Sequence, residues 1–428
     1  MKSKTLAVDI LNIFPRKISE IISKLIIRLT KKRFFKELDE LNKLYPTKIL
    51  DRSIHFNRIL IIRLDALGDM VWTTAFIREI RRNYPDALID IVARKGITSL
   101  LETCPYIDNI FSYDCDAIGD VINNNYKDIE KRAEKFASKF LIPNNYDVVF
   151  LPREIYCDTG YDNIALAFLS GAKYRLARGI SYNHLQSARS FFTKKYFSEF
   201  LTVEKPRHEV DQILDLIRCL DGSIENNRME VWESKKSKEQ AMELLFEAGL
   251  KEKGIHIVVG ISGSSASRAW PIENYIELFQ QITNAYGDKI SFIICGGSEL
   301  NQYADKFVGN NIINIVGKTD LLQLVSVIKY SDMYLGADTG IMQIAAASGK
   351  PIVEISAHLK DDKYCRQGHA TLSGPWQVPA IVIEPEHGLD SCVGTCEMTY
   401  PHCIKQVKVK EVFDALDNIL TSVIVKLN

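Results

Sequence analysis

Three groups of charged, hydroxyl and glycine residues follow directly after apolar runs of the kind that are buried in parallel sheets. The first group, RLDALGD at 63–69, closes the apolar run that begins at Arg58. Gly68 lets the backbone turn sharply, and Asp69 then falls at a helix start, where the partial positive charge favours an ionised carboxylate. Asp69 is therefore a candidate general base toward a hydroxyl group. The simpler alternative is that Asp69 or Asp65 only caps the helix.

The second group is SGSSASRAWP at 262–271, which also follows an apolar run. Small hydroxyl and glycine residues allow backbone amides to approach phosphate oxygens, and the helix start that follows supplies a favourable field. Arg268 could bind a diphosphate through two hydrogen bonds and stabilise the charge that develops as it leaves. Neither a Walker P-loop nor a GxGxxG fingerprint is present in this loop, and the missing fingerprint disfavours a Rossmann dehydrogenase.

The third group is GADTGIMQ at 336–343, another turn between an apolar run and a helical segment. Asp338, Thr339 and the amides of Gly340 and Ile341 would meet a diphosphate or a ribose at the helix N-terminus. A helix cap is the alternative for Thr339. Three such turns in one chain favour a ligand-binding cleft between two domains.

The elements that position these groups alternate between short apolar runs and helical segments. In the N-terminal half we expect a helix over 69–83 and strands over 58–64, 88–92, 107–111 and 147–151. In the C-terminal half we expect strands over 255–261, 290–295, 312–316, 333–336 and 351–355, and helices over 273–284, 320–329 and 341–348. A polar stretch at 221–238 connects the halves. This alternation predicts an α/β fold with two Rossmann-like domains.

Composition excludes some classes of protein and favours others. The chain has 428 residues, enough for two domains of ordinary size. Lys plus Arg and Asp plus Glu both total 54, and this balance argues against a nucleic-acid partner. Nine scattered cysteines are typical of a reducing compartment, so a cytoplasmic protein is expected. No run reaches the about 18 uncharged apolar residues typical of a transmembrane helix.

The N-terminal segment 1–36 carries ten Lys or Arg residues against only Asp9 and Glu20. Between residues 18 and 29, apolar residues recur at helical spacing while most of the basic residues fall elsewhere around the helix. Such a basic amphipathic helix could make peripheral contact with an anionic membrane surface. The alternative is a helix that packs on the main body and keeps its charges in solvent.

In their order and spacing, the motifs resemble glycosyltransferase family 9, whose best-known members are the ADP-heptose lipopolysaccharide heptosyltransferases. The likeness runs from about residue 57 to 425 and includes the opening strand, turn and helix. It also includes the segments SGSSASRAWP, DTGIMQIAAASGKPIV, HEVDQILDLI and SCVGTCEMTYPHCIKQV. The resemblance implies a GT-B fold of two Rossmann-like domains that face each other across a cleft. The chain would then consist of a helical extension at 1–56, an acceptor domain at 57–235 and a donor domain at 236–428. The last helix of the donor domain could pack back on the acceptor domain.

The resemblance also implies an inverting mechanism that needs no metal or cofactor and uses a nucleotide-sugar donor such as ADP-heptose. The acceptor would be a cell-envelope glycan such as the lipopolysaccharide core. Asp69 would deprotonate the acceptor hydroxyl, and Arg268 would stabilise the departing diphosphate. The residues expected to bind the donor are Ser264, Glu299, Asp338, Thr339, Gly340 and Gln343.

One position departs from the family pattern, because Gln343 stands where the family usually has histidine. Glutamine can donate a hydrogen bond to a phosphate oxygen but carries no charge. The alternative hypothesis is therefore a sugar-nucleotide-binding protein of the same fold that has lost turnover. A GT-B-like epimerase, which would need no acceptor, is a third hypothesis.

Two further groups are candidates for binding. Arg63 and Asp65 in the first turn, and Arg153 and Asp158 after the strand at 147–151, could touch a polar, phosphorylated acceptor. The second group consists of four cysteines that could form a four-thiolate metal site: Cys365, Cys392, Cys396 and Cys403. Their spacing is looser than that of a zinc ribbon, and buried structural thiols are the alternative.

Overall fold

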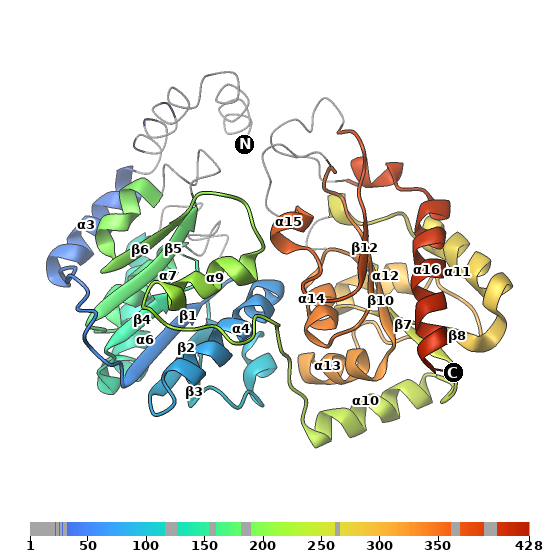
Figure 1. Ribbon diagram of the computed structural model, residues 1–428, viewed down its shortest axis with the longest axis horizontal. Coiled ribbons are helices and arrows are strands. Elements are labelled where there is room, and N and C mark those ends of the chain that lie inside the picture. Colours follow the sequence, from blue (N-terminus) through green and yellow to red (C-terminus); the bar gives the residue numbers. More distant parts are fainter. Residues whose placement is uncertain are drawn as a thin grey trace. The chain divides into compact units, whose positions relative to one another are not determined.

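The computed structural model describes residues 22, 25, 28, 32–115, 126–153, 160–180, 190–261, 266–360, 369–388 and 400–427. They belong to two compact units, Met1–Asn227 and Arg228–Asn428. Each unit contains a six-stranded parallel sheet flanked by helices (Figure 1). The prediction of an α/β fold with two Rossmann-like halves is confirmed.

The first unit has the strand order β3-β2-β1-β4-β5-β6, with β1 between β2 and β4. Its strands are β1 (Arg58–Arg63), β2 (Leu88–Arg94), β3 (Asn109–Tyr113), β4 (Val148–Leu151), β5 (Tyr174–Ile180) and β6 (Glu199–Val203). The first four match the expected apolar runs. β5 and β6 were not predicted, because Arg175 and Arg178 interrupt the apolar pattern of β5 and most of β6 is only half-buried.

Helices cover both faces of this sheet, which explains why β1 is apolar almost without interruption. Leu60 and Ile62 of β1 join a core with α3 (Lys32–Leu44), α6 (Tyr126–Phe140) and α7 (Gly160–Leu169). On the other face, α4 (Leu67–Asn83) packs against α9 (Glu209–Arg218), and the ring of Phe76 meets Phe150 of β4 at 5.5 Å between centroids. Short 3-10 helices span Thr98–Leu101, Ile142–Asn144 and Lys194–Tyr196.

Part of the N-terminal segment belongs to the first unit. Phe34, Leu38 and Leu41 of α3 are buried, and the Phe34 ring contacts Tyr126 and Tyr161 edge-on. The predicted basic helix falls mainly on residues 1–31, which lie outside the described residues apart from positions 22, 25 and 28. The membrane contact predicted for 1–36 therefore stays a prediction. Over the described part of the chain, no helix is both long enough and apolar enough to cross a membrane.

The second unit has the strand order β12-β11-β10-β7-β8-β9. Its strands are β7 (Ile255–Gly260), β8 (Ile290–Cys295), β9 (Ile312–Asn314), β10 (Met333–Ala337), β11 (Ile352–Ile355) and β12 (Ala380–Ile383). The first five correspond to the expected runs. The edge strand β12 was missed, since it is only partly buried.

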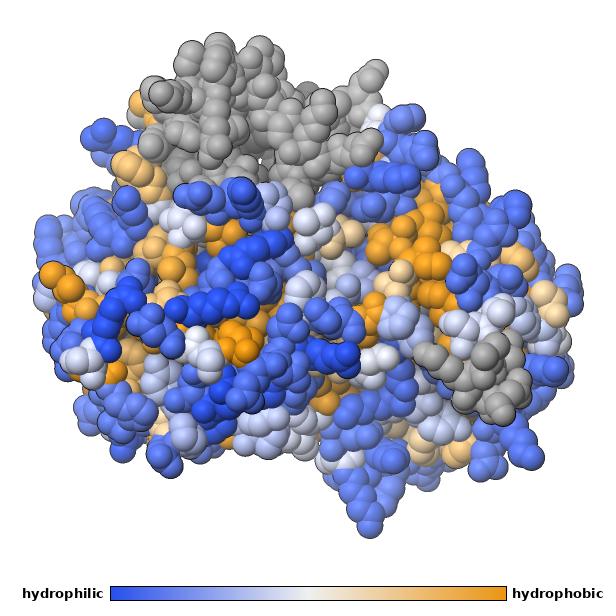
Figure 2. Space-filling view, viewed as in Figure 1, coloured by the Kyte–Doolittle hydropathy of each residue, from blue (hydrophilic) through white to orange (hydrophobic). Residues whose placement is uncertain are grey.

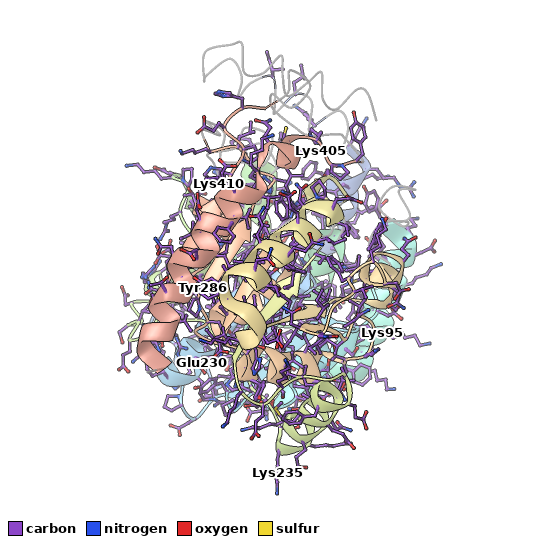
Figure 3. All side chains as sticks on the ribbon, turned by 90° about the vertical axis from the view of Figure 1, so that its right-hand side faces the viewer. Lys95, Glu230, Lys235, Tyr286, Lys405 and Lys410 are labelled. Carbon is purple, nitrogen blue, oxygen red and sulfur yellow. The ribbon has the colours of Figure 1, made fainter. Side chains whose placement is uncertain are left out.

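The helices of this unit are α10 (Lys235–Glu247), α11 (Ile272–Tyr286), α12 (Asn301–Ala304), α13 (Leu321–Tyr330), α14 (Gly340–Ala347), α15 (Ala370–Ser373) and α16 (Val409–Leu427). Figure 3 shows α16 and α11 side by side, and the Tyr286 hydroxyl donates a hydrogen bond to Asp417. Val412, Leu416 and other apolar residues of α16 lie in the core of this unit. The last helix thus buries apolar side chains on α11 and on the sheet of its own unit, and its expected packing on the acceptor domain stays a prediction.

Both sheets reverse their strand order at a central pair of strands. In the first unit the chain runs outward from β1 to β3 and then returns to place β4 beside β1, and in the second unit β10 returns beside β7. Ligands of open parallel sheets bind beyond the carboxyl ends of the strands at such a reversal. Hydrophilic side chains cover most of the surface visible in Figure 2, with apolar side chains in patches between them.

Candidate functional site

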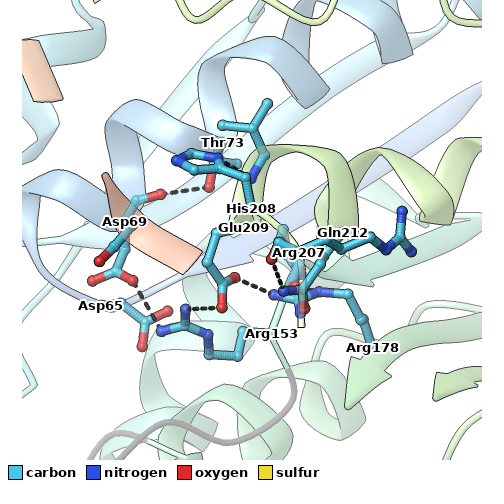
Figure 4. A network of polar contacts seen from close by, with 12 residues as sticks. Asp65, Asp69, Thr73, Arg153, Arg178, Arg207, His208, Glu209 and Gln212 are labelled. Atoms are coloured by element: carbon cyan, nitrogen blue, oxygen red, sulfur yellow. Dashed lines mark hydrogen bonds and ion pairs between the residues drawn. The ribbon is translucent and has the colours of Figure 1, made fainter. Parts of the chain in front are cut away.

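In the first unit, the predicted motif lies where the strand order reverses. Arg63 is the last residue of β1 and Asp69 lies in the first turn of α4. Arg153 follows the neighbouring strand β4. The structure brings these three side chains together with Asp65, as Figure 4 shows for Asp65, Asp69 and Arg153. Asp158 lies outside the described residues.

The two oxygens of the Asp69 carboxylate have different partners. Oδ2 accepts a hydrogen bond of 3.1 Å from the backbone N–H of Ala66, so Asp69 does cap the start of α4. Oδ1 accepts from Arg63 Nη2 at 3.2 Å and from Arg153 Nη1 at 2.9 Å. Oδ2 therefore serves the helix cap, as the alternative predicted, while Oδ1 is bound by two guanidinium groups.

Asp65 is buried beside this pair. Its Oδ2 lies 3.2 Å from Arg63 Nε, but the two groups are not aligned as a hydrogen bond, and among the described residues neither oxygen of Asp65 has a hydrogen-bond partner. Burial raises the pKa of Asp65, while the Arg63 charge lowers it and the Asp69 charge raises it further. Asp65 thus favours its protonated form more than an exposed aspartate does.

Glu209 at the start of α9 joins this cluster, although sequence analysis did not single it out. Its Oε1 lies 2.7 Å from Arg153 Nη2, and its Oε2 lies 2.6 Å from Arg178 Nη2 of β5. Burial acts to raise the pKa of Glu209, but the charges of Arg153, Arg178 and Arg63 outweigh it and lower the pKa to about 2. Glu209 is consequently ionised at neutral pH. The sequence signals were the pair of arginines within β5 and the segment HEVDQILDLI at 208–217, which contains Glu209.

The second unit has its own group at the corresponding reversal. Arg268 ends the 3-10 helix Ala266–Arg268 that follows β7, and Asp338 follows β10. Arg268 Nη1 lies 3.5 Å from Asp338 Oδ2, with 28% of the arginine side chain and 10% of the aspartate side chain exposed. The structure thus pairs the two residues on which the predicted diphosphate site depends. Ser264 lies outside the described residues.

The third motif begins a helix next to this pair. The Thr339 hydroxyl accepts hydrogen bonds from the backbone N–H groups of Ile341 and Met342 at 3.2 and 3.3 Å, so Thr339 is the N-cap of α14. At Gly336, where φ is +144°, a Cβ atom would lie 2.2 Å from the carbonyl oxygen of Gly260. Glycine therefore permits the close approach of β10 to β7 at the point where the strand order reverses.

Comparison with known proteins supports the resemblance. The profile of "Glycosyltransferase family 9 (heptosyltransferase)" matches residues 167–362. The chain is 22% identical to lipopolysaccharide heptosyltransferase 3 of Escherichia coli over 67% of this chain and 80% of that protein. It is 23% identical to lipooligosaccharide heptosyltransferase 2 of Haemophilus influenzae over 69% of this chain and 82% of that protein.

Two solved structures have a similar fold. A family 9 glycosyltransferase from Veillonella parvula aligns with a TM-score of 0.68 and 19% identity, over 88% of this chain and 99% of that one. The E. coli heptosyltransferase WaaC with ADP aligns with a TM-score of 0.59 and 15% identity, over 84% and 99%. This chain is thus similar in sequence and in fold to heptosyltransferases of glycosyltransferase family 9. The likeness to these structures confirms the predicted GT-B fold.

Two further donor candidates, Gln343 and Glu299, differ in exposure. Gln343 of α14 is buried, its Nε2 donates a hydrogen bond of 2.5 Å to the carbonyl oxygen of Ser373, and among the described residues its Oε1 has no hydrogen-bond partner. Glu299, in the 3-10 helix Ser298–Leu300, is exposed, and its carboxylate lies against the backbone of Gly297. Glu299 is thus open to a ligand, whereas the Gln343 amide is already engaged with the protein.

Glu354 is a charged residue near the donor turn that sequence analysis missed. It lies on β11 opposite Gly336 of β10 and has no exposed surface. Among the described residues, neither of its oxygens has a hydrogen-bond partner. Burial raises the pKa of Glu354 well above its usual value, the charges of Asp338 and Glu384 raise it further, and Arg268 lowers it. A glutamate inside the apolar run PIVEI at 351–355 was the available signal.

The proposed cysteine site is largely outside the described part of the chain. Cys403 is buried, and Cys365, Cys392 and Cys396 lie outside the described residues. Within the described ranges, no group of three or more His, Cys, Asp or Glu residues is arranged to hold a metal ion. The four-thiolate site therefore stays a prediction from the sequence.

The buried carboxyl of Glu354 predicts a pH-dependent stability. Because the pKa of Glu354 is raised above 4.5 in the folded state, the unfolded chain releases this proton at lower pH than the folded chain. The free energy of unfolding therefore falls as the pH rises above 4.5 until the folded carboxyl also ionises. We expect Glu354→Gln to match the free energy of unfolding of the wild type at pH 4 and to exceed it at pH 8, where only the wild type has a carboxyl group that folding keeps protonated.

Urea unfolding at both pH values measures this difference. Glu247→Gln, at an exposed position of α10, is the matched control and should not alter the pH dependence. A Glu354→Gln variant that loses stability equally at both pH values would show that this carboxyl is ionised in the folded protein.

Proposed function

We propose that this protein is an inverting glycosyltransferase that moves a heptose-like sugar from a nucleoside diphosphate to a cell-envelope glycan such as the lipopolysaccharide core. The observation that carries the proposal is the pairing of Arg268 with Asp338 at the strand-order reversal of the second unit. The names of the curated relatives support it, because they are lipopolysaccharide and lipooligosaccharide heptosyltransferases. The structural neighbour with ADP supports a nucleoside diphosphate as the donor's leaving group.

On the donor side, Arg268 would bind the diphosphate. Its guanidinium is partly exposed and is 3.5 Å from Asp338, so it can turn toward phosphate oxygens without leaving a deeply buried site. The N-terminus of α14, which Thr339 caps, would add a favourable field at Gly340. As the sugar–oxygen bond breaks, the electron pair stays on the diphosphate, and Arg268 stabilises the added charge. No metal or cofactor is then required.

On the acceptor side, Asp69 would accept the proton of the attacking hydroxyl. The oxygen of that hydroxyl forms a bond to the anomeric carbon on the face opposite the diphosphate, which inverts the configuration at that carbon. Asp69 Oδ1 must release at least one of Arg63 and Arg153 to receive the hydroxyl. Once released, Arg63 could bind an anionic group of the acceptor, and Asp65, Arg153 and Asp158 are further proposed acceptor contacts.

The acceptor also suggests where the protein acts. A glycan anchored in a membrane lipid would bring the enzyme to the cytoplasmic face of that membrane, and the basic segment 1–36 could bind anionic headgroups there. We propose such a peripheral location.

The engaged side chain of Gln343 supports a second candidate function. Its Nε2 donates to the Ser373 carbonyl, and it replaces a histidine that could carry a positive charge toward a phosphate. The alternative is therefore a protein of the same fold that binds a nucleotide-sugar but does not transfer the sugar.

Asp69→Asn tests the role of Asp69 as the proposed base. Asparagine retains an oxygen that can accept from the Ala66 N–H, but it cannot take up a proton at neutral pH. We expect kcat to fall by about 10²- to 10⁴-fold, with ADP binding within about twofold of the wild type. Transfer from ADP-heptose to a lipopolysaccharide core acceptor, followed by mass spectrometry, measures the rate. Asp86→Asn, at an exposed position of the same unit, is the control, and full activity of Asp69→Asn would rule out Asp69 as the base.

The variant Gln343→His separates the two candidate functions. If the protein is a transferase, the wild type turns over ADP-heptose and Gln343→His changes kcat by less than about tenfold, since Arg268 supplies the main charge. If it has lost turnover, the wild type binds ADP-heptose without transfer, and Gln343→His restores product formation. Binding by thermal shift and product formation by mass spectrometry, measured on both proteins, distinguish these outcomes.

A further inference from the structure

One guanidinium group bridges two carboxylates in the first unit. Arg153 uses Nη1 for Asp69 at 2.9 Å and Nη2 for Glu209 at 2.7 Å (Figure 4). Because the two nitrogens belong to one rigid planar group, the position of Glu209 fixes how the guanidinium approaches Asp69. Arg153 lies after the end of β4, outside any helix or strand. Its side chain therefore depends on such contacts for its orientation.

Glu209 is in turn fixed by a second arginine. Its Oε2 lies 2.6 Å from Arg178 Nη2, and Arg178 Nη1 donates to Gln212, one turn further along α9. The Nε of Arg178 donates a hydrogen bond of 2.9 Å to the carbonyl oxygen of Pro152, the residue before Arg153. Glu209 and Arg178 thus hold both the side chain of Arg153 and the backbone that precedes it.

The helix that carries Glu209 also packs on the helix that carries Asp69. α9 lies against α4, and His208, the N-cap of α9, places its ring edge-on to Trp72 of α4 with 6.1 Å between centroids. The His208 Nδ1 accepts from the Val210 N–H at 3.2 Å. The start of α9 is therefore held in place next to the first turns of α4.

We propose that Glu209 is a positioning residue that acts on Asp69 through Arg153, and the proposal rests on Asp69 being the base of the proposed function. Glu209 engages one edge of the Arg153 guanidinium, so that Arg153 meets Asp69 through a single nitrogen. Without Glu209, Nη2 of Arg153 loses this charged partner, and the guanidinium can turn to form a two-nitrogen pair with Asp69. Such a pair stabilises the ionised carboxylate and makes it a weaker proton acceptor. The low pKa of Glu209 means that this control persists at neutral pH.

The test is a double-mutant cycle on the full chain, with ADP-heptose and a lipopolysaccharide core acceptor both varied. Glu209→Gln should lower kcat by about 10- to 100-fold and leave the KM for the donor within about threefold. In the Asp69→Asn background, Glu209→Gln should cause less than about a threefold further loss, because its effect passes through Asp69. Asp215→Asn, an acid of α9 that pairs with Arg207 and Arg218 instead, should leave kcat unchanged.

A second variant covers the case in which Glu209→Gln does not fold. Arg153→Gln removes the guanidinium that bridges Asp69 and Glu209, while Glu209 keeps its contact with Arg178. This variant should lower kcat, and in the Asp69→Asn background it should cause little further loss of kcat. A rise in the KM for the acceptor with an unchanged kcat would limit Arg153 to binding the acceptor and overturn the positioning role.

Two results separate this inference from the proposed function. If the wild type is active and the double variant loses kcat by the product of the two single-variant losses, the inference is overturned and the proposed function is not. A wild type that binds ADP-heptose but forms no product with any core acceptor would overturn the proposed function, and with it the role given to Glu209.

Discussion

The carboxylate of Asp69 lies between a backbone amide and two guanidinium groups, and the first unit is built around this arrangement. Arg63 at the end of β1 and Arg153 after β4 both contact Oδ1, while the Ala66 N–H contacts Oδ2. Buried charges are costly unless they are paired. Glu209 and Arg178 supply the additional pairing, and they can do so only because β5 and α9 lie next to β4 and α4. The strand order of the sheet is therefore the condition under which the site can exist.

The corresponding group in the second unit is looser. Arg268 and Asp338 lie at the equivalent reversal of strand order, but they form one partly exposed contact of 3.5 Å. A partly exposed arginine side chain can reorient toward a ligand at low cost, which suits a residue that meets a charged diphosphate. A candidate base needs a fixed direction, which the buried contacts of Asp69 provide. The difference between the two groups thus matches the two roles proposed for them.

Much of this arrangement could be predicted from the sequence, because the motifs at 63–69 and 336–343 follow continuous apolar strands. Their residues had to lie at the carboxyl ends of those strands, whatever the rest of the fold. Glu209 and Arg178 could not be found in this way. They are close to Asp69 only through pairing between segments more than one hundred residues apart in the sequence, and the arginines of β5 hide that strand from a search for apolar runs.

Glu354 shows a related limit of the sequence pattern. A single acid in an apolar run predicts nothing about its neighbours, and only the register with Gly336 places it beside the donor turn.

The cap formed by Thr339 was predicted as an alternative to phosphate binding, and the structure contains that cap. A capping hydroxyl and a bound phosphate can share a helix start, because the cap uses the hydroxyl and the phosphate would meet backbone amides.

Calorimetric titration of ADP into the wild type and into Arg268→Ala is the most direct measurement of whether the donor binds in the second unit. We predict that the wild type binds ADP and that Arg268→Ala weakens the affinity by about 10- to 100-fold, the loss expected for a charge-assisted contact to a diphosphate. Unchanged affinity in Arg268→Ala would contradict the placement of the diphosphate at Arg268 and Asp338.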